Sequence, residues 1–283
     1  MDRAKIVACV MLLLSVGCGR PARIVVASKN FTEQVLLGEL LAQQIERRLG
    51  VQVERRLNLG GTMLAHEALT RGDIDLYPEY TGTALTAVLK QAPMKDPSAA
   101  LAAVRAAYES QWKLAWLAPL GFNDTFAMIV NRGAGMATLS EAAAKQAWRM
   151  GIGYEFQQRP DGLDGLVKTY ALRLAAPPVT MDLGLLYAAL QGGKVDMIAA
   201  NSTDGLASAL DVKILDDDRH YFPPYECAVV VRDDSLARYP KLRGALEELS
   251  GKIPDADMRK LNYEVDGKHR AAAEVAADWL RQH

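Results

Sequence analysis

Two side chains suited to ligand contact, those of Tyr80 and Asn201, follow predicted strands at matching points of a repeated pattern. Residues 68–77 align with residues 189–198, because each segment has the end of a helix, a Gly turn and a hydrophobic strand with Asp in second place. Ligands in open α/β sheets bind beyond the carboxyl ends of the strands. Two lobes that face each other would therefore place Tyr80 and Asn201 on opposite walls of one binding cleft.

Motifs for covalent or metal chemistry are not found in the sequence. The four histidines, at positions 66, 220, 269 and 283, lack the spacing of metal ligands. No Ser-His-Asp or Cys-His set is visible, and the Leu-Gly-Gly-Thr loop at 59–62 lacks the Lys-Ser/Thr ending of a P-loop. Glu79, Asp124 and Asp204 could act as general acids or bases, so an enzyme stays open as the less favoured alternative.

The composition is that of a folded protein with an ordinary surface. The chain has 283 residues, of which 50% are hydrophobic and 24% charged, and this balance excludes disorder as the main state. The length fits two lobes of roughly 100–150 residues each. A net charge of -1 makes nucleic-acid binding by bulk charge a poor prediction. Cys227 lies in an apolar run and is interpreted as a small buried hydrophobe.

The hydrophobic pattern predicts an alternation of strands and helices that occurs twice. The first third shows strands at 24–27, 51–54 and 74–77, a helix at 32–49, and a second helix that follows the loop 58–62 and runs to about 71. The middle third shows strands at 127–130, 150–153 and 195–199, and helices at 163–174 and 181–191. The last third, from Leu236, is mostly helix and is expected to pack back on the first lobe. This order predicts an α/β fold with parallel strands, and crossings between lobes near 125–128 and 224–227.

The first residues have the pattern of an export signal. Arg3 and Lys5 precede an apolar stretch at 6–16, which is too short for a membrane-spanning helix of roughly 20 residues. Residues 15–18, Ser-Val-Gly-Cys, resemble the lipobox of bacterial lipoproteins, although Ser15 stands where Leu is usual. This resemblance implies removal of signal peptide 1–17 and lipidation of Cys18; an ordinary signal peptide is the alternative. We therefore expect an extracytoplasmic protein, in the periplasm or at the cell surface, that is lipid-anchored to a membrane.

Several short segments, spread in order over nearly all of the mature chain, carry a more specific resemblance. They are Ser-Lys-Asn-Phe-Thr-Glu-Gln at 28–34, the 59–62 loop, Tyr-Pro-Glu-Tyr-Thr-Gly-Thr at 77–83, and the segments 122–126, 159–163, 202–205 and 222–225. Together they resemble the substrate-binding proteins of ABC importers for glycine betaine, carnitine and choline, the osmoprotectant-uptake family. The resemblance implies a two-lobed periplasmic-binding architecture of type II, with a doubly wound sheet in each lobe and the ligand in the interlobe cleft. The expected lobes are residues 22–126 plus 226–283, and residues 127–225.

The resemblance also implies roles for eight residues. A betaine joins a quaternary ammonium, which aromatic faces hold, to a carboxylate, which Arg, Lys and hydroxyl donors hold. The implied walls of the cation cage are Tyr80, Phe126 and Tyr225. The implied donors to the carboxylate are Lys29, Thr83 and Arg159. Asp124 is expected beside the cation. Asn201 stands where the family usually has a fourth aromatic, which favours a ligand with an extra polar group, and ergothioneine is the runner-up.

Several of these residues have a simpler alternative. Lys29 could be a solvated residue at a helix start, and Arg159 could pair with Asp161 or Asp164 on the surface. Phe126 could fill the core, and Tyr225, after two prolines, could pack at a hinge.

The function that the resemblance implies is capture of a quaternary-ammonium compound by closure of the cleft. The binding protein, expected to be a monomer, would deliver this ligand to an ABC permease and its ATPase. We expect no catalytic residue, no metal, no cofactor and no nucleic acid.

Overall fold

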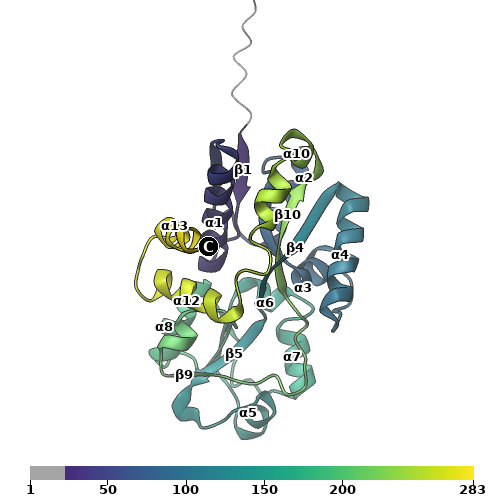
Figure 1. Ribbon diagram of the computed structural model, residues 1–283. Coiled ribbons are helices and arrows are strands. Elements are labelled where there is room, and N and C mark those ends of the chain that lie inside the picture. Colours follow the sequence, from purple (N-terminus) through teal and green to yellow (C-terminus); the bar gives the residue numbers. More distant parts are fainter. Residues whose placement is uncertain (1–22) are drawn as a thin grey trace, which may run out of the picture.

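The polypeptide forms two five-stranded sheets in a computed structural model that describes residues 23–283 (Figure 1). The first sheet has the order β2-β1-β3-β10-β4, with strands Val53–Arg56, Ile24–Ala27, Leu76–Tyr80, Glu226–Arg232 and Leu114–Asn123. The second sheet has the order β7-β6-β8-β5-β9, with strands Val179–Thr180, Met150–Ile152, Met197–Asn201, Phe126–Asn131 and Val212–Ile214. The signal peptide and Cys18 lie outside the described residues.

The two sheets have the same pattern of pairing. In the first, β1 is parallel to β2 and β3, and β10 is antiparallel to β3 and β4. In the second, β6 is parallel to β7 and β8, and β5 is antiparallel to β8 and β9. This confirms the predicted α/β fold of two similar lobes, and it makes β3 equivalent to β8. Tyr80 and Asn201 are the last residues of these two strands.

The first lobe is completed by helices from both ends of the chain. They are α1 (Thr32–Leu49), α2 (Thr62–Arg71), α3 (Thr81–Thr83), the π-helix η1 (Ala84–Val88), α4 (Pro97–Trp112), α10 (Asp233–Arg238), α11 (Leu242–Glu247), α12 (Asp255–Asp266) and α13 (Ala272–Gln282). Helix α1 has the predicted bounds, because its leucines recur at helical spacing and Gly50 ends it in the left-handed region (φ 68°). It contacts α11, α12 and α13, and Leu36 and Leu40 share a core with Val275 and Trp279. The last third therefore packs on the first lobe, as predicted.

The second lobe places helices on both faces of its sheet. They are the 3₁₀ turn η2 (Arg132–Ala134), α5 (Leu139–Lys145), α6 (Tyr154–Gln158), α7 (Leu163–Tyr170), α8 (Leu183–Gln191) and α9 (Leu206–Ala209). Met128 of β5 faces the core that holds Trp148 and Phe156. Ile129, the next residue of β5, faces the opposite core with Leu186 of α8. This alternation buries the sheet on both sides, which is typical of doubly wound folds.

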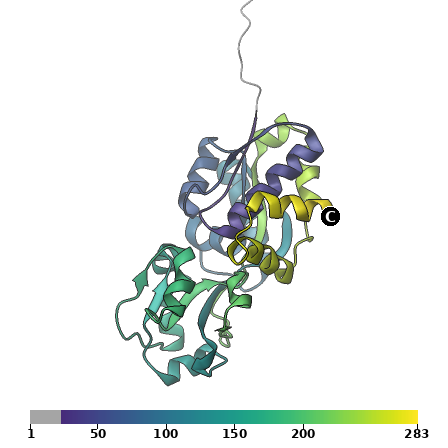
Figure 2. The same ribbon diagram turned by 90° about the vertical axis from the view of Figure 1, so that its left-hand side faces the viewer.

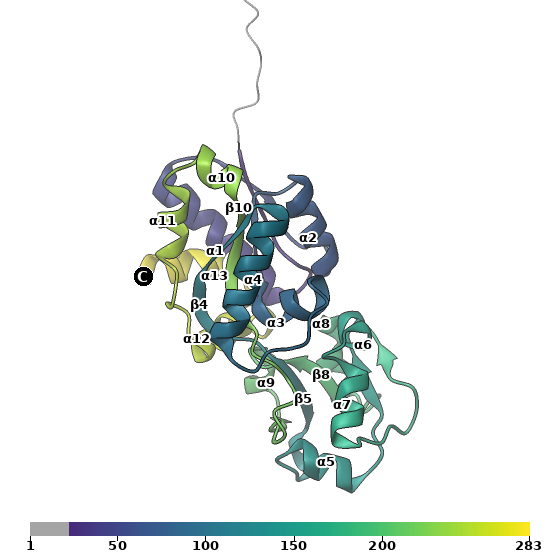
Figure 3. The same cartoon turned by 90° about the vertical axis from the view of Figure 1, so that its right-hand side faces the viewer.

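The chain crosses between the lobes twice, and the two crossings are hydrogen-bonded to each other. It passes from β4, which ends at Asn123, to β5, and returns from β9 to β10. The backbone N–H of Tyr225 donates to Asn123 Oδ1 at 2.6 Å, and that of Asp124 donates to the Tyr225 carbonyl at 3.2 Å. Figures 2 and 3 show the two bodies and the segments that join them. Phe126, which was expected to be the last residue of the first lobe before the crossing, is the first residue of β5 in the second sheet. The lobe limits otherwise stay a prediction.

Several elements differ from the sequence expectation. Strand β3 continues past Pro78 to Tyr80, because β3 pairs with β1 only at Leu76 and Pro78 lies beyond that ladder. Helix α7 ends at Tyr170 instead of 174, where Ala171 adopts a left-handed conformation (φ 52°). Helix α4 and strand β4 were not predicted. Within residues 23–283, no helix is long and apolar enough to cross a membrane.

Candidate ligand-binding site

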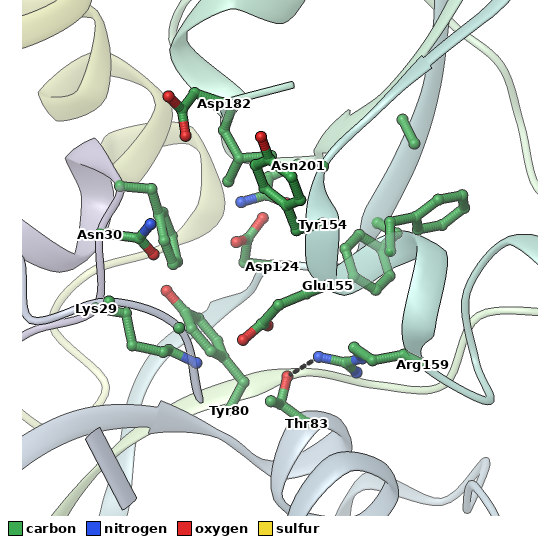
Figure 4. Close-up of a pocket in the computed structure, with 18 of the residues that line it drawn as sticks. Lys29, Asn30, Tyr80, Thr83, Asp124, Tyr154, Glu155, Arg159, Asp182 and Asn201 are labelled. Atoms are coloured by element: carbon green, nitrogen blue, oxygen red, sulfur yellow. Dashed lines mark hydrogen bonds between the residues drawn. The ribbon is translucent and has the colours of Figure 1, made fainter. Parts of the chain in front are cut away.

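A cavity of about 660 Å³ lies between the two lobes, at the carboxyl ends of the parallel strands. Its volume is within the range of about 300–1,000 Å³ that is usual for small-molecule sites. The structure brings all eight predicted site residues to its walls: Lys29, Tyr80, Thr83, Asp124, Phe126, Arg159, Asn201 and Tyr225. Six of them, all except Phe126 and Tyr225, are labelled in Figure 4. These residues come together because the loops that follow equivalent strands of the two sheets face each other.

The predicted cage rings lie on both walls and where the lobes join. Tyr80, at the end of β3, is 4% exposed, and Phe31 stacks on it with 6.3 Å between ring centroids. Phe126, at the start of β5, meets Tyr225 edge to face at 5.8 Å. Asn201 is the strand partner of Phe126 and brings an amide to the cavity. The three rings therefore border one space, which fits a cationic ligand.

Lys29 is paired inside its own wall. Its Nζ lies 2.6 Å from Glu79 Oε1, with both side chains buried, and 4.7 Å from the centroid of the Tyr80 ring. Glu79 also accepts hydrogen bonds from the Tyr77 hydroxyl and the backbone N–H of Tyr80. The ammonium is thus neither solvated nor uncompensated. Glu79 balances the charge of Lys29, and the binding of a ligand carboxylate by Lys29 stays a prediction.

Arg159 is also paired, and it links the two lobes. Its Nε donates to Asp161 Oδ1 at 2.9 Å, and its Nη2 to Asp161 Oδ2. Its Nη1 donates to Thr83 Oγ1 at 2.8 Å, and its Nη2 to Thr86 Oγ1 at 3.2 Å, as Figure 4 shows for Thr83. Burial acts to raise the pKa of Asp161, but the hydrogen bonds and charge of Arg159 hold it below the usual value. The alternative of an Arg159–Asp161 pair is therefore confirmed, but the pair is buried and not on the surface.

Three carboxyls lie close together at one side of the cavity: Asp124, which is buried and lines it, Glu33, which is buried, and Asp204, which is half-buried. Glu33 accepts hydrogen bonds from the hydroxyls of Tyr80, at 2.7 Å, and Thr203, and from the Asn262 amide, at 3.0 Å. Burial raises the pKa of Glu33. Burial and then the charge of Glu33 raise the pKa of Asp124 well above its usual value, and burial raises that of Asp204 to about 7.

Among residues 23–283, none of these three carboxyls forms an ion pair with a Lys, Arg or His side chain. Burial raises the pKa of these carboxyls, and a cation in the neighbouring cavity would favour their ionised form and be stabilised by the charge. The same region holds no group of three His, Cys, Asp or Glu residues arranged to bind a metal ion.

The cavity also contains residues that the sequence analysis missed. Glu155 Oε1 accepts a hydrogen bond from the backbone N–H of Thr62 at 2.6 Å, and Oε2 accepts one from the Thr62 hydroxyl at 3.1 Å. Tyr154 and Asp182 line the second wall beside it. Glu155 follows β6 and Asp182 follows β7, so the strand-end rule that selected Tyr80 could have found them as well.

Comparison with known proteins identifies the family. Residues 22–282 match the family model OpuAC, described as the substrate binding domain of ABC-type glycine betaine transport systems. The chain belongs to this family. Its solved relatives include a glycine betaine/carnitine/choline ABC transporter protein, with 32% identity, a TM-score of 0.78 and coverage of 92% of this chain and 98% of that one. Apo YehZ from Escherichia coli has 27% identity, a TM-score of 0.69 and coverage of 93% and 99%.

Curated relatives carry names of several transport proteins. The chain is 34% identical over 265 residues to the ergothioneine transport permease/ergothioneine binding protein EgtU of Helicobacter pylori, covering 92% of this chain and 47% of that one. It therefore spans about half the length of that relative. It is 32% identical over 259 residues to the carnitine transport binding protein OpuCC of Listeria monocytogenes, covering 89% and 84%. These findings confirm the family that the sequence motifs indicated.

Proposed function

We propose that this chain is the extracytoplasmic binding component of an ABC importer that captures a quaternary-ammonium compound such as glycine betaine, choline or carnitine. One observation carries the proposal. The rings of Tyr80, Phe126 and Tyr225 border one cavity, and the buried, unpaired carboxyls of Glu33 and Asp124 lie beside it. A methylated cation has no N–H to donate, so ring faces and negative potential are the interactions that suit it. The relatives named above are transport binding proteins, so we propose a binding protein and not an enzyme.

A bulkier betaine, such as ergothioneine, is the second candidate. The cavity of about 660 Å³ extends beyond the three rings to polar side chains of both walls, Asn30, Asp182 and Asn201. These groups can accept hydrogen bonds from, or donate them to, a second polar part of the ligand. The relative named for ergothioneine transport supports this candidate.

Closure of the cleft and membrane anchoring complete the proposal. Hydrogen bonds from Arg159 to Thr83 and from Thr62 to Glu155 join the two walls across the cavity, and a ligand held by both walls would stabilise the same arrangement. The lipobox-like residues 15–18 support a lipid on Cys18, which mass spectrometry of the mature N-terminus tests. The permease and its ATPase are the proposed partners.

The test is titration calorimetry of the mature chain with matched ligands. Glycine betaine, choline, carnitine and ergothioneine form the panel. The control is 3,3-dimethylbutanoate, which has the shape of glycine betaine with carbon in place of the charged nitrogen. We expect at least one quaternary ammonium compound to bind, and any binding of the carbon analogue to be at least about tenfold weaker than that of glycine betaine. The proposal fails if no compound of the panel binds, or if the charged and uncharged isosteres bind alike.

A further inference from the structure

The carboxyl of Asp124 faces the cavity without a basic partner. Asp124 is 7% exposed and lines the cavity, and Figure 4 shows its carboxyl directed into the space between the walls. The backbone fixes its position, because its N–H donates to the Tyr225 carbonyl and its Oδ1 accepts from the Thr203 N–H, both at 3.2 Å. A cation held by the rings would therefore meet a buried carboxyl that no side chain of the described residues neutralises.

The carboxyl of Glu33 lies next to that of Asp124, and the two side chains are hydrogen-bonded to each other. Two carboxyl groups can form such a bond only when one of them carries a proton. Glu33 accepts hydrogen bonds from three neutral donors, which are the hydroxyls of Tyr80 and Thr203 and the amide of Asn262. These donors favour the ionised form of Glu33, so the proton of this carboxyl pair, Glu33 and Asp124, resides on Asp124.

Other acidic groups surround the carboxyl pair. Asp204 accepts from the Tyr187 hydroxyl at 3.1 Å, and its charge acts on Asp124. Asp266 of α12 in turn acts on Asp204. The thiol and the hydroxyls beside the pair stay neutral, because burial raises their pKa values: Cys227, Tyr80 and Tyr187. The neighbouring carboxyls add negative potential, which helps to hold the proton on Asp124.

The basic groups on neighbouring elements form no ion pair with the carboxyl pair. The Lys29 ammonium is held by Glu79. The guanidinium of Arg259 on α12 donates to a backbone carbonyl at 3.1 Å, and the charge of His269 acts on Asp266. The other charged residues that line the cavity are Glu155, Arg159 and Asp182. With no cation of the protein paired to it, the carboxyl pair responds to a cation that a ligand brings.

From this arrangement we infer that a quaternary-ammonium ligand displaces the proton of Asp124, so that capture of the cation releases a proton to the solvent and becomes tighter as the pH rises. The inference rests on the proposed function and adds the regulation of the same site. No covalent bond other than the O–H of Asp124 changes: the carboxyl becomes a carboxylate beside the cation, and the proton passes to water.

Burial, followed by the charge of Glu33, raises the pKa of Asp124 in the ligand-free protein. A cation beside Asp124 lowers that pKa. Between the lower pKa of the complex and the higher pKa of the free protein, binding releases a proton and affinity increases with pH. Above the pKa of the free protein Asp124 is already ionised, and affinity no longer changes with its titration.

The experiment counts the protons that binding releases. Choline is the probe, or glycine betaine where it binds more tightly, because neither compound gains or loses a proton between about pH 4.5 and 9, so a released proton comes from the protein. Calorimetry in buffers of different ionisation enthalpy gives the count. At some pH in this range we expect release of at least about 0.4 proton per bound ligand. Affinity should be at least about fivefold higher at the top of the range than at the bottom.

Matched variants assign the proton to one carboxyl. Asp124→Asn keeps the shape and the acceptor for the Thr203 N–H but cannot titrate, so release should fall below about 0.1 proton and affinity should vary less than about twofold with pH. Asp204→Asn should still release a proton, because Asp124 remains. Asp73→Asn makes the same change at an exposed position before β3 and should leave the count unchanged. If Asp124→Asn does not fold, the measurements on the wild-type chain decide.

Each result bears on a separate claim. Binding without release of a proton at any pH in the range overturns the inference, and so does a release that persists in Asp124→Asn. Either result leaves the proposed function standing, because a quaternary ammonium compound still binds. Failure of both probes to bind overturns the inference, and failure of the whole panel overturns the proposed function as well.

Discussion

Each wall of the cleft is built on an equivalent pair of strands, one pair in each sheet, but the aromatic ring stands on the first strand type in one lobe and on its partner in the other. In the first lobe β3 pairs with β10, and Tyr80 faces Cys227 across the ladder. In the second lobe β8 pairs with β5, and Asn201 faces Phe126. Each pair therefore brings one ring and one small or polar side chain to its end. The repeated backbone fixes where a ring can stand, and the side-chain sequence decides which strand carries it.

The walls differ more in how they hold their buried cation. In each wall a paired cation lies over the ring: Lys29 Nζ is 4.7 Å from the Tyr80 centroid, and the Arg159 guanidinium carbon is 5.0 Å from that of Phe126. The Lys29 ammonium has two hydrogen-bond partners, Thr62 and Glu79, and both belong to its own lobe. Arg159 instead donates to Thr83 and Thr86 of the opposite lobe. The ammonium of the first wall is thus held within its own lobe, whereas the guanidinium of the second wall is held in part by the opposite lobe.

The largest expected effect comes from breaking the pair of the second wall. Arg159→Ala leaves Asp161 buried without its counter-charge, so the free energy of unfolding should fall by about 3–5 kcal/mol. Urea unfolding followed by tryptophan fluorescence measures this loss. The control is Arg149→Ala, whose pair with Asp196 has side chains 50% and 33% exposed and should contribute no more than about 1 kcal/mol. Equal losses for the two variants would show that the Arg159 pair is not effectively buried.

The next effect compares the rings. Tyr80 is 4% exposed and Phe126 is half-buried, and a cation–ring contact is stronger where water is excluded. Tyr80→Leu should therefore weaken binding of choline by about 2 kcal/mol, or roughly 30-fold, and Phe126→Leu by about 0.5–1 kcal/mol. Calorimetry measures both. Phe122→Leu is the control, since this ring is buried in the first lobe away from the cavity and its loss should change stability but not affinity. Similar losses at Tyr80 and Phe126 would remove the difference between the walls.

The fold was predictable where the sequence carries a period or a repeat. The spacing of leucines in residues 32–49 gave the bounds of α1, and the helix–Gly–strand repeat gave the equivalence of β3 and β8. Helix α4 was missed although it has clear signals. Asp96 caps it by accepting from the backbone N–H groups of Ser98 and Ala99, and Pro97 stands at its first turn. The prediction ended strand β3 before Pro78, whereas the strand continues to Tyr80. The sequence does not show that β1 pairs with β3 only at Leu76, which leaves no β1 partner that needs an N–H from Pro78.

The site was predictable in its residue types but not in its pairing. Strand ends and family motifs selected eight residues that line one cavity. The sequence could not show that Lys29 pairs with Glu79, since these residues are 50 positions apart, or that Glu155 reaches Thr62, 93 positions away. The first contact depends on the order of strands in one sheet, and the second depends on the relative placement of the lobes. This information decides whether a basic residue is available to a ligand or is already neutralised by the protein.

The smallest expected effect tests whether the asymmetry of the rings is functional, by adding a ring at the half-buried end of β8. Asn201→Tyr places an aromatic opposite Phe126, so the second wall would carry a ring on both strands. Because Asn201 is partly exposed, the gain in affinity for choline should be about 0.5–1 kcal/mol, or roughly two- to fivefold. Asn201→Leu, which adds apolar surface without a ring, is the matched control and should give no gain. If the two variants bind choline equally, then the face of a ring at this position does not contact the cation, and the second wall presents its ring from β5 alone.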